Sequence, residues 1–468
     1  MVEQTEREGK RPLKVAVVGA GPSGFYAIRA LYKSGKAECR VDLFDRLPTP
    51  FGLVRGGVAP DHQKIKNVVR VYESIAEDER TRFFGNVTLG VDITIDELSA
   101  RYDAVILATG NEADRRLGLD GEDLKGVHSA TEFVGWYNGH PDFQDRQFDL
   151  KNTQRVVIVG NGNVAMDVAR VLVRSVESLR ETDITEQAIQ ALSESRVQDI
   201  VLLGRRGPAQ AAFSPKEIRE LSEVDGCSLR VSKDHVNLSD EMQAWLEEHG
   251  SRDAHKNFEF LTQIAMSDQT AEHHRTVRCI FRSSPSAFAG QAGSLTGVVA
   301  EENELYLDER GHPRPRGTGR TQHIEAQLVF KAIGYRGTPI PGVPFHEAWG
   351  IVPNDQGRVL TAPDGTLVER MYVVGWAKRG PTGLIGTNNA DSKATVMLLL
   401  EDWAAGCLSA PKYTEDVAEL LARRSVKVVR WSDWKRLDAL EIENGLPLGK
   451  VREKFTRIDE MLQAIFPQ

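Results

Sequence analysis

The sequence predicts an α/β fold in which one three-layer unit, a parallel sheet covered by helices, is inserted into a second unit of the same kind. Two glycine-rich turns, at 19–24 and 160–165, carry this prediction because each lies between an apolar strand and a helix. The alternation of strands and helices restarts after the second turn, and further strands follow near the C-terminus. We place the domain limits at 1–111, 112–330 and 331–468, with the first and last segments forming one domain.

The first segment alternates between strands and helices. Apolar strands are expected at 14–18, 40–45 and 103–109. A helix follows the first glycine turn and continues to about Leu31, and another is expected at 61–77. This order is typical of parallel strands joined by covering helices.

The second segment repeats this order. A strand at 155–159 leads into a helix from about Val164, and a polar helical insertion at 171–195 precedes a strand at 199–203. Residues 250–325 are polar and irregular, and several antiparallel strands are expected there. The final elements are strands at 327–333 and 371–375 and a helix at 390–403.

Composition excludes several classes of protein. A chain of 468 residues corresponds to two or three domains, and its net charge of -8 argues against a nucleic-acid binder. No apolar run approaches the roughly 20 residues that a membrane helix needs. The four cysteines lie far apart, which argues against a zinc ribbon, a cysteine-ligated iron–sulfur cluster and a CxxC disulfide reductase, and no metal site is expected. Residues 1–14 have three glutamates and no apolar core, so a cytoplasmic location is predicted.

The first glycine turn has the pattern GxGxxG. Gly19 permits a tight turn, Gly21 lets a pyrophosphate approach the backbone, and Gly24 lets the helix pack against the strand. Asp45 ends the next strand, 21 residues beyond Gly24, where an acid can bind a ribose hydroxyl. The pattern indicates a dinucleotide site for FAD or NAD; the alternative is a glycine turn in an α/β sheet that binds no nucleotide.

The second turn, Gly160–Ala165, has the pattern GxGxxA, but no acid ends the following strand. Arg205 and Arg206 stand there instead, and guanidinium groups suit the 2′-phosphate of NADP(H). The alternative is a solvated charged turn. Two sites with different ribose chemistry indicate a flavoprotein reductase in which NADPH reduces FAD.

The loop Pro48–His62 (PTPFGLVRGGVAPDH) closely resembles the adrenodoxin reductase family, especially its bacterial ferredoxin–NADP reductases of mycobacterial type. The resemblance continues through Gly160–Arg170, Gly204–Phe213 and Gly375–Asn388 and covers nearly the whole chain. It implies two Rossmann-like domains, with the NADP-binding domain inserted into the FAD-binding domain. It also implies single-electron transfer to a ferredoxin.

The resemblance also assigns residues to each cofactor. It places Ser23, Asp45, Leu53 and Ile93 near FAD, with Trp376, Gly383, Leu384 and Ile385 lining the flavin. It places Arg115, Asn161, Gly162, Asn163, Val164, Arg205, Arg206 and Glu217 near NADP(H), and Gly383 near the nicotinamide as well. Asp45, Gly56 and Gln63 depart from the residues most common in the family.

Gly383–Thr387 precedes a helix expected from about Ala390. A helix N-terminus there would stabilise the negative charge of reduced flavin; the alternative is an ordinary helix cap.

His62 has two interpretations. It can be a surface residue in the first turn of a helix capped by Asp61. The family resemblance instead pairs His62 with Glu220 near the nicotinamide and flavin, where both would tune cofactor geometry. Glu217 shares a helix face with Glu220, but Ser214–Glu217 also has the pattern of a capping box.

Residues 421–457 contain ten Lys and Arg against five Asp and Glu, a local net charge of +5. This segment is a candidate docking site for an acidic ferredoxin, or an ordinary charged helical surface. The candidate residues are Arg423, Arg424, Lys435, Arg436, Lys450, Arg452 and Lys454.

The predicted function is therefore an NADPH-dependent, FAD-containing ferredoxin reductase, expected to be a monomer, that serves cytochromes P450 or other ferredoxin-dependent enzymes. The alternatives are another two-dinucleotide flavoprotein with a quinone or diaphorase-type acceptor, and a non-catalytic NADP-binding protein.

Overall fold

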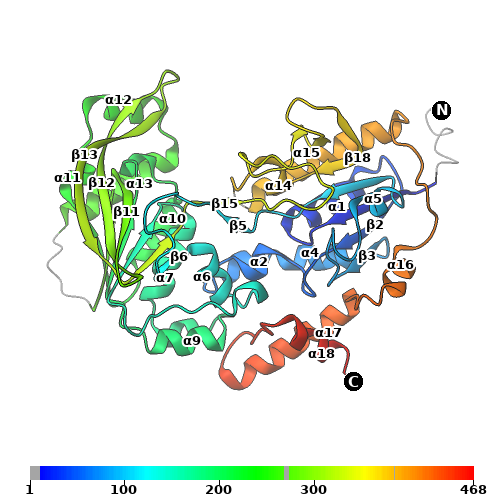
Figure 1. Ribbon diagram of the computed structural model, residues 1–468, viewed down its shortest axis with the longest axis horizontal. Coiled ribbons are helices and arrows are strands. Elements are labelled where there is room, and N and C mark those ends of the chain that lie inside the picture. The colour runs from blue at the N-terminus through cyan, green and yellow to red at the C-terminus, as the bar shows by residue number, and fades with distance from the viewer. Residues whose placement is uncertain (1–10, 268–273, 384, 468) are drawn as a thin grey trace.

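The structure is a computed structural model that describes residues 11–267, 274–383 and 385–467. Two large sheets lie on either side of a narrow connection (Figure 1). The first sheet has the strand order β16-β17-β18-β4-β1-β2-β3. These strands are β1 (Leu13–Val18), β2 (Cys39–Phe44), β3 (Thr81–Phe84), β4 (Ala104–Leu107), β16 (Asn354–Asp355), β17 (Arg358–Leu360) and β18 (Leu367–Val373).

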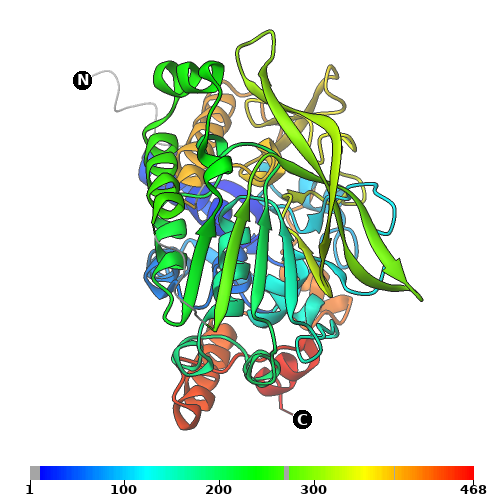
Figure 2. The same ribbon diagram turned by 90° about the vertical axis from the view of Figure 1, so that its left-hand side faces the viewer.

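The second sheet is parallel throughout and has the order β6-β14-β7-β8-β10-β9. Its strands are β6 (Val127–Ser129), β7 (Arg155–Val159), β8 (Asp199–Leu203), β9 (Cys227–Val231), β10 (Arg275–Ile280) and β14 (Leu328–Lys331). A three-stranded antiparallel arm, β11 (Ser283–Gln291), β12 (Ser294–Leu307) and β13 (Pro313–Glu325), crosses one face of this sheet (Figure 2).

The sheets are covered in different ways. Helices pack on both faces of the first sheet, with α1 (Pro22–Ser34) and α15 (Ile385–Ala404) on one face and α5 (Ile95–Ser99) and α16 (Val417–Arg423) on the other. Helices cover only one face of the second sheet; on the other face Phe288, Val298 and Ile324 of the arm pack against β7, β8 and β14. The fold class, two Rossmann-like units with one inserted into the other, is confirmed.

The remaining helices connect these layers. They are α2 (Leu53–Gly56), α3 (Gln63–Lys66), α4 (Val69–Ala76), α6 (Ala130–Tyr137), α7 (Asn163–Val173), α8 (Val176–Arg180), α9 (Glu186–Ser193), α10 (Pro215–Ser222), α11 (Lys233–Val236), α12 (Asp240–His249), α13 (Arg252–Met266), α14 (Trp376–Arg379), α17 (Trp431–Gly445) and α18 (Ile458–Ile465). Short 3-10 turns lie at Pro141–Phe143, Pro208–Gln210 and Leu446–Leu448. None of the helices in the described residues is long and apolar enough to cross a membrane.

The chain passes between the two sheets at two neighbouring places. β5 (Ala113–Asp114) leaves the first sheet and β15 (Tyr335–Arg336) returns to it, and the two pair antiparallel. The outward and returning chains therefore lie side by side (Figure 1).

Several element predictions are corrected. The helix expected at 61–77 is two helices, α3 and α4, and the helix expected from Ala390 begins at Ile385. The region 250–325 is less irregular than expected, because it contains the fifteen-residue helix α13 and the parallel strand β10 besides the antiparallel arm. Its polar composition reflects the largely exposed face of α13 and the exposed strand β13, where mainly one side of each element packs inward.

Candidate functional site

The first glycine turn is shaped for close backbone approach. Gly19 has φ +112°, and a Cβ on it would overlap the carbonyl oxygen of Ala108 at the end of β4. A Cβ on Gly24 would overlap the carbonyl oxygen of Gly19. In contrast, the space beside Gly21 is open to 3.9 Å. Gly21 takes the N-cap position of α1 and has no side chain to cap it, so the free N–H groups of the first turn can bind a phosphate.

Asp45 anchors this turn. Its carboxylate accepts hydrogen bonds from the backbone N–H of Ala20 at 2.8 Å and of Leu47 at 2.9 Å. Burial raises the pKa of Asp45 to about 6, against the lowering effect of these two bonds. Each carboxylate oxygen can accept a second hydrogen bond, so Asp45 can also bind a ribose hydroxyl.

The second glycine turn repeats the first. Gly160 has φ +133°, and a Cβ on it would overlap the carbonyl oxygen of Ala332, just beyond β14. Nothing lies within 4 Å of the position that a Cβ on Gly162 would occupy. The helix α7 begins at Gly162 without a side-chain cap, whereas serine or threonine side chains cap α6, α9, α10, α12 and α13. Both glycine turns therefore present helix N-termini without side-chain caps.

The predicted NADP residues gather around this turn. Asn163 accepts a hydrogen bond from the backbone N–H of Ser214 at 2.8 Å, which joins α7 to the start of α10. The side chain of Asn161 packs against Gly204, where a Cβ would collide with it. Val164 is half-buried in the first turn of α7.

Arg205 and Arg206 follow β8 at the same sheet edge, with Arg205 exposed and Arg206 half-buried. Burial, together with the charges of Arg205 and Arg314, lowers the pKa of Arg206, and no described carboxylate offsets them. Uncompensated guanidinium groups at this edge form a site for an anion.

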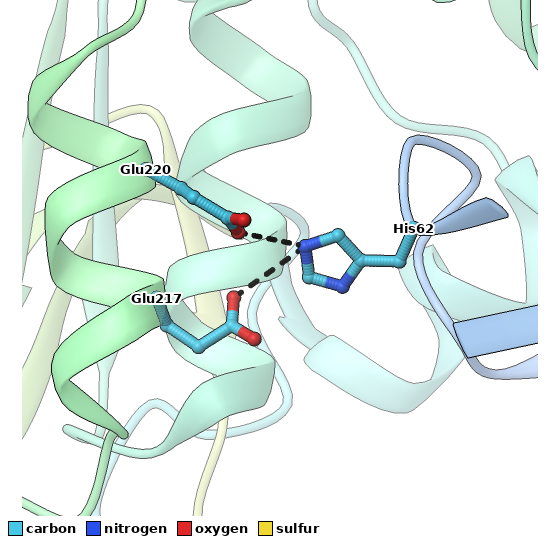
Figure 3. Close-up of side chains that lie close together, drawn as sticks. All are labelled: His62, Glu217 and Glu220. Carbon is cyan, nitrogen blue, oxygen red and sulfur yellow. Dashed lines mark hydrogen bonds and ion pairs between the residues drawn. The ribbon is translucent and has the colours of Figure 1, made fainter. Parts of the chain in front are cut away.

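His62 lies between the two domains and faces two carboxylates on α10 (Figure 3). Its Nε2 is 3.0 Å from Glu220 Oε2 and 3.7 Å from Glu217 Oε2. The imidazole is buried, so the interpretation of His62 as a surface residue is wrong. Burial would raise the pKa of Glu220, but hydrogen bonds from His62 and Lys216 outweigh it and lower that pKa.

Arg170, which the sequence analysis did not single out, connects the surrounding acids. Its guanidinium donates to Asp61 at 2.6 Å, to Asp167 at 2.6 Å and to Glu217 at 3.0 Å, and only 2% of its side chain is exposed. Asp61 belongs to the first domain, whereas Arg170, Asp167 and Glu217 belong to the second. Asp61 is therefore an interdomain ligand of Arg170 and not a helix cap, and His62 takes the N-cap position of α3.

Glu217 binds Arg170 through its side chain, which corrects the predicted capping box. The hydroxyl of Ser214 accepts from the backbone N–H of Glu217 at 3.4 Å, and Pro215 occupies the first turn. The backbone N–H of Ser214 donates to Asn163 instead of Glu217. Only half of the box forms, because the glutamate belongs to the buried ion-pair network.

A cavity of about 630 Å³ adjoins the histidine–glutamate pair. Asp61, His62, Arg174, Lys216 and Glu220 line part of its wall. The pair therefore borders an open cavity at the boundary between the two domains.

Of the remaining predicted flavin residues, Ser23 belongs to the first turn, and Leu53 follows Gly52, where a Cβ would lie 3.1 Å from the Cα of Gly21. Ser23 is buried against Gly375, and the side chain of Leu53 packs over Gly57. The side chain of Ile93 lies in the apolar core, 1% exposed, so only its backbone can face a cofactor.

The return crossing and the last glycine motif complete this region. Trp376 lies 5.3 Å from the ring of Tyr335, and its buried indole N–H has no hydrogen-bond partner among the described atoms. Arg115 is exposed and donates weakly to the carbonyl oxygen of Tyr335 at 3.4 Å. Gly383 has φ +79°, α15 begins at Ile385, and Leu384 lies outside the described residues.

The basic segment at 421–457 is not a uniform patch. Lys450 and Lys454 are buried, so they are wrong as docking residues. Lys454 binds Asp183 at 2.9 Å, beside Lys66, which binds the same carboxylate at 2.7 Å. Arg452 is one-quarter exposed and pairs with Asp438. Counting charges along the sequence did not reveal this burial, in which Lys454 contacts the carbonyl oxygen of Arg55 in the first domain and Asp183 in the second.

The other four basic candidates reach the surface. Arg423, Arg424 and Lys435 pair with Glu415, Glu97 and Glu73, and Arg436 donates to the carbonyl oxygen of Ile465.

Comparisons with known proteins agree with this geometry. A model of the pyridine nucleotide-disulphide oxidoreductase family matches residues 13–202. NADPH-ferredoxin reductase FprA of Mycobacterium leprae is 42% identical, over 96% of this chain and 97% of its own length. The mitochondrial NADPH:adrenodoxin oxidoreductase of Arabidopsis thaliana is 39% identical, over 97% of this chain and 95% of its own.

The chain belongs to the NADPH–ferredoxin and adrenodoxin reductase family.

Among solved structures, Mycobacterium tuberculosis FprA in complex with NADPH matches 97% of this chain and 100% of its own, with a TM-score of 0.90 and 40% identity. The agreement extends over both sheets, so the two glycine turns belong to a shared two-domain fold. The family resemblance of the motifs is thereby confirmed.

Proposed function

We propose that this protein is an NADPH–ferredoxin reductase that binds FAD at the first glycine turn and NADP(H) at the second. When bound, the flavin supplies the chemistry, because it accepts a hydride and releases electrons singly to an iron–sulfur partner. The observation that carries the proposal is the contrast between the two turns. Both lead into helices without side-chain caps, but Asp45 stands beside the first and Arg205 and Arg206 beside the second.

The residues of the first domain fit FAD. Gly19, Gly21 and Gly24 provide the close backbone approach that a pyrophosphate needs, and Asp45 offers acceptor capacity to a ribose. The indole N–H of Trp376 is buried without a partner among the described atoms, which suits a hydrogen bond to a bound group. Ser23, Leu53, Ile93, Gly383, Leu384 and Ile385 remain predicted neighbours of the flavin.

The residues of the second domain fit NADP(H). The turn from Asn161 to Val164 would hold the pyrophosphate, and Arg205 and Arg206 would bind the 2′-phosphate. Arg115 remains a predicted contact from the crossing. We assign His62 and Glu220 the role of orienting the nicotinamide against the flavin, with Glu217 fixed by Arg170 beside them.

We propose that the partner is an acidic ferredoxin and that Arg423, Arg424, Lys435 and Arg436 contribute to its docking. Arg423 and Lys435 each pair with one acid, Arg436 donates to a carbonyl oxygen, and Arg424 binds Glu97 and the carbonyl oxygen of Asp92. All four are at the surface, so a more acidic partner can compete for these cations. The apparent KM for ferredoxin should then rise with salt, while that for NADPH rises less; a flat response would oppose this surface.

Other properties remain proposals. They are a monomeric state, domain limits near 111 and 330, and a cytoplasmic location, which the four free cysteines suit.

An anaerobic titration with NADPH and then NADH, followed at the flavin absorption band, tests the proposal. We expect NADPH to bleach the flavin efficiently and NADH weakly, and cytochrome c reduction to depend on added ferredoxin. A yellow protein that bleaches but ignores ferredoxins would favour a quinone or diaphorase-type acceptor. A protein without flavin would favour a non-catalytic NADP-binding role.

A further inference from the structure

The turn that carries Arg205 and Arg206 is held by the antiparallel arm. The carbonyl oxygen of Gly204 accepts from the backbone N–H of Ser283, and that of Arg206 accepts from the backbone N–H of Arg282, both at 3.0 Å. Arg282 has φ +51°, an uncommon conformation for a residue with a side chain. Arg282, just before β11, and Ser283, its first residue, therefore fix the backbone on both sides of Arg205.

Asn303 of β12 fixes Arg205 itself. Its side-chain Nδ2 donates to the carbonyl oxygen of Arg205 at 3.0 Å and to Ser284 Oγ at 2.8 Å. Its backbone N–H donates to the carbonyl oxygen of Arg282 at 2.7 Å. Asn303 is 5% exposed and lies where the register of β12 and β13 shifts after Glu301. One buried amide thus joins the arm, the strained residue and the arginine turn.

We propose that Asn303 is a positioning residue that sets the preference for a 2′-phosphate by holding the backbone of Arg205. Arg205 is exposed, so its side chain has few neighbours to orient it. Its direction therefore depends on the peptide from which it projects. Paired guanidinium–phosphate contacts require a defined geometry, and a rotated peptide would weaken them.

The proposal rests on the proposed role of Arg205 and Arg206 as the 2′-phosphate site. It adds that specificity for the phosphorylated coenzyme depends on a residue almost a hundred positions away, in an arm that the glycine and arginine motifs do not include. The side chain of Leu305, two residues along the same strand, would lie 3.3 Å from a Cβ on Gly207, so β12 follows the whole turn.

Binding of 2′,5′-ADP and 5′-ADP to the flavin-loaded full-length protein, measured by calorimetry, tests the proposal. The variants are Asn303→Ala and Asn303→Ser, neither of which can reach the carbonyl oxygen of Arg205. The matched control is Thr318→Ala, because Thr318 is half-buried on the same arm and its hydroxyl bonds within the arm: it donates to the carbonyl oxygen of Glu302 at 3.0 Å and accepts from the backbone N–H of Arg320 at 3.3 Å. Flavin content and melting temperature report the integrity of each variant.

The ratio of the two dissociation constants decides the outcome. In both Asn303 variants, we expect the ratio of the dissociation constant for 5′-ADP to that for 2′,5′-ADP to fall about five-fold, the effect of one lost hydrogen bond. In Thr318→Ala this ratio should stay at the wild-type value. Equal weakening of both ligands, or an unchanged ratio, would overturn the role of Asn303 and leave that of the arginines intact. A wild-type protein with no preference would instead overturn the proposed 2′-phosphate site.

Discussion

Replacing Arg170 with methionine should destabilise the second domain strongly. The guanidinium is 2% exposed, and its partners Asp61, Asp167 and Glu217 are buried or nearly so. Removing one partner of a buried ion pair costs about 3–5 kcal/mol of unfolding free energy, because Asp167 and Glu217 then stay buried without the guanidinium, while Asp61 keeps Arg174. At about 2–4 °C per kcal/mol for a unit of this size, the melting temperature should fall by about 6–20 °C.

Arg174→Met is the matched control. Arg174 binds the same Asp61 carboxylate at 2.6 Å, but 34% of its side chain is exposed, so its loss should cost about 0–1 kcal/mol. Calorimetry of both variants at pH 8 measures the difference. An equal loss of unfolding free energy in Arg170→Met and Arg174→Met would refute the reasoning that burial of the arginine decides how much stability is lost.

The pH dependence provides a second check on Arg170→Met. Burial would raise the pKa of Asp61, but Arg170 foremost, together with His62 and Arg174, lowers it to about 2. This group therefore stabilises the wild-type protein above its unfolded pKa near 4, and the contribution is lost as the pH falls toward 2. Without Arg170, Asp61 should protonate at higher pH. The difference in unfolding free energy between variant and wild type should therefore be largest at pH 8 and smaller at pH 5. An identical gap at both would contradict this.

Three further predictions concern single residues. Gly162→Ala should keep the melting temperature but raise the KM for NADPH about ten-fold or more. Gly160→Ala should destabilise the fold, because of these two glycines only Gly160 lacks space for a Cβ. Similar melting curves for the two variants would oppose this. His62→Ala should slow flavin reduction by NADPH several-fold in stopped-flow experiments, and a wild-type rate would exclude a role for His62 beside the nicotinamide. Burial lowers the pKa of Lys454 to about 7. Lys454 therefore disfavours folding most below pH 7, and less as the pH rises toward the pKa that this lysine has in the unfolded chain. Wild type should therefore gain stability relative to Lys454→Met between pH 7 and 9 in urea titrations, and parallel pH profiles would exclude that shift.

Local patterns predicted the sheet edges well. Gly19 and Gly160 stand in short turns whose backbone geometry requires glycine at fixed positions. The spacing of the glycines in the sequence is therefore enough to locate these turns. The strand at 155–159 coincides with β7 for the same reason, since an apolar run between polar turns leaves little choice.

Long-range pairing was harder to predict. Nothing near Arg170 in the sequence shows that its partner Asp61 lies in another domain, and nothing near Arg205 indicates Asn303. Burial of Lys450 and Lys454 was missed because lysine is rarely enclosed, and their enclosure involves the distant acids Glu186 and Asp183. The composition of a segment reports its charge but not which of its side chains face inward.

The paired crossing of β5 and β15 has a consequence for how this architecture arises. Because Tyr335 lies opposite Asp114, the points at which the chain leaves the first sheet and returns to it are neighbours. A whole folding unit can thus be accommodated between them without separating the strands on either side. A short linker between the same two points would bypass the inserted unit without cutting a strand of the first sheet, although the ion pairs of Asp61 and Asp183 with the other domain would be lost.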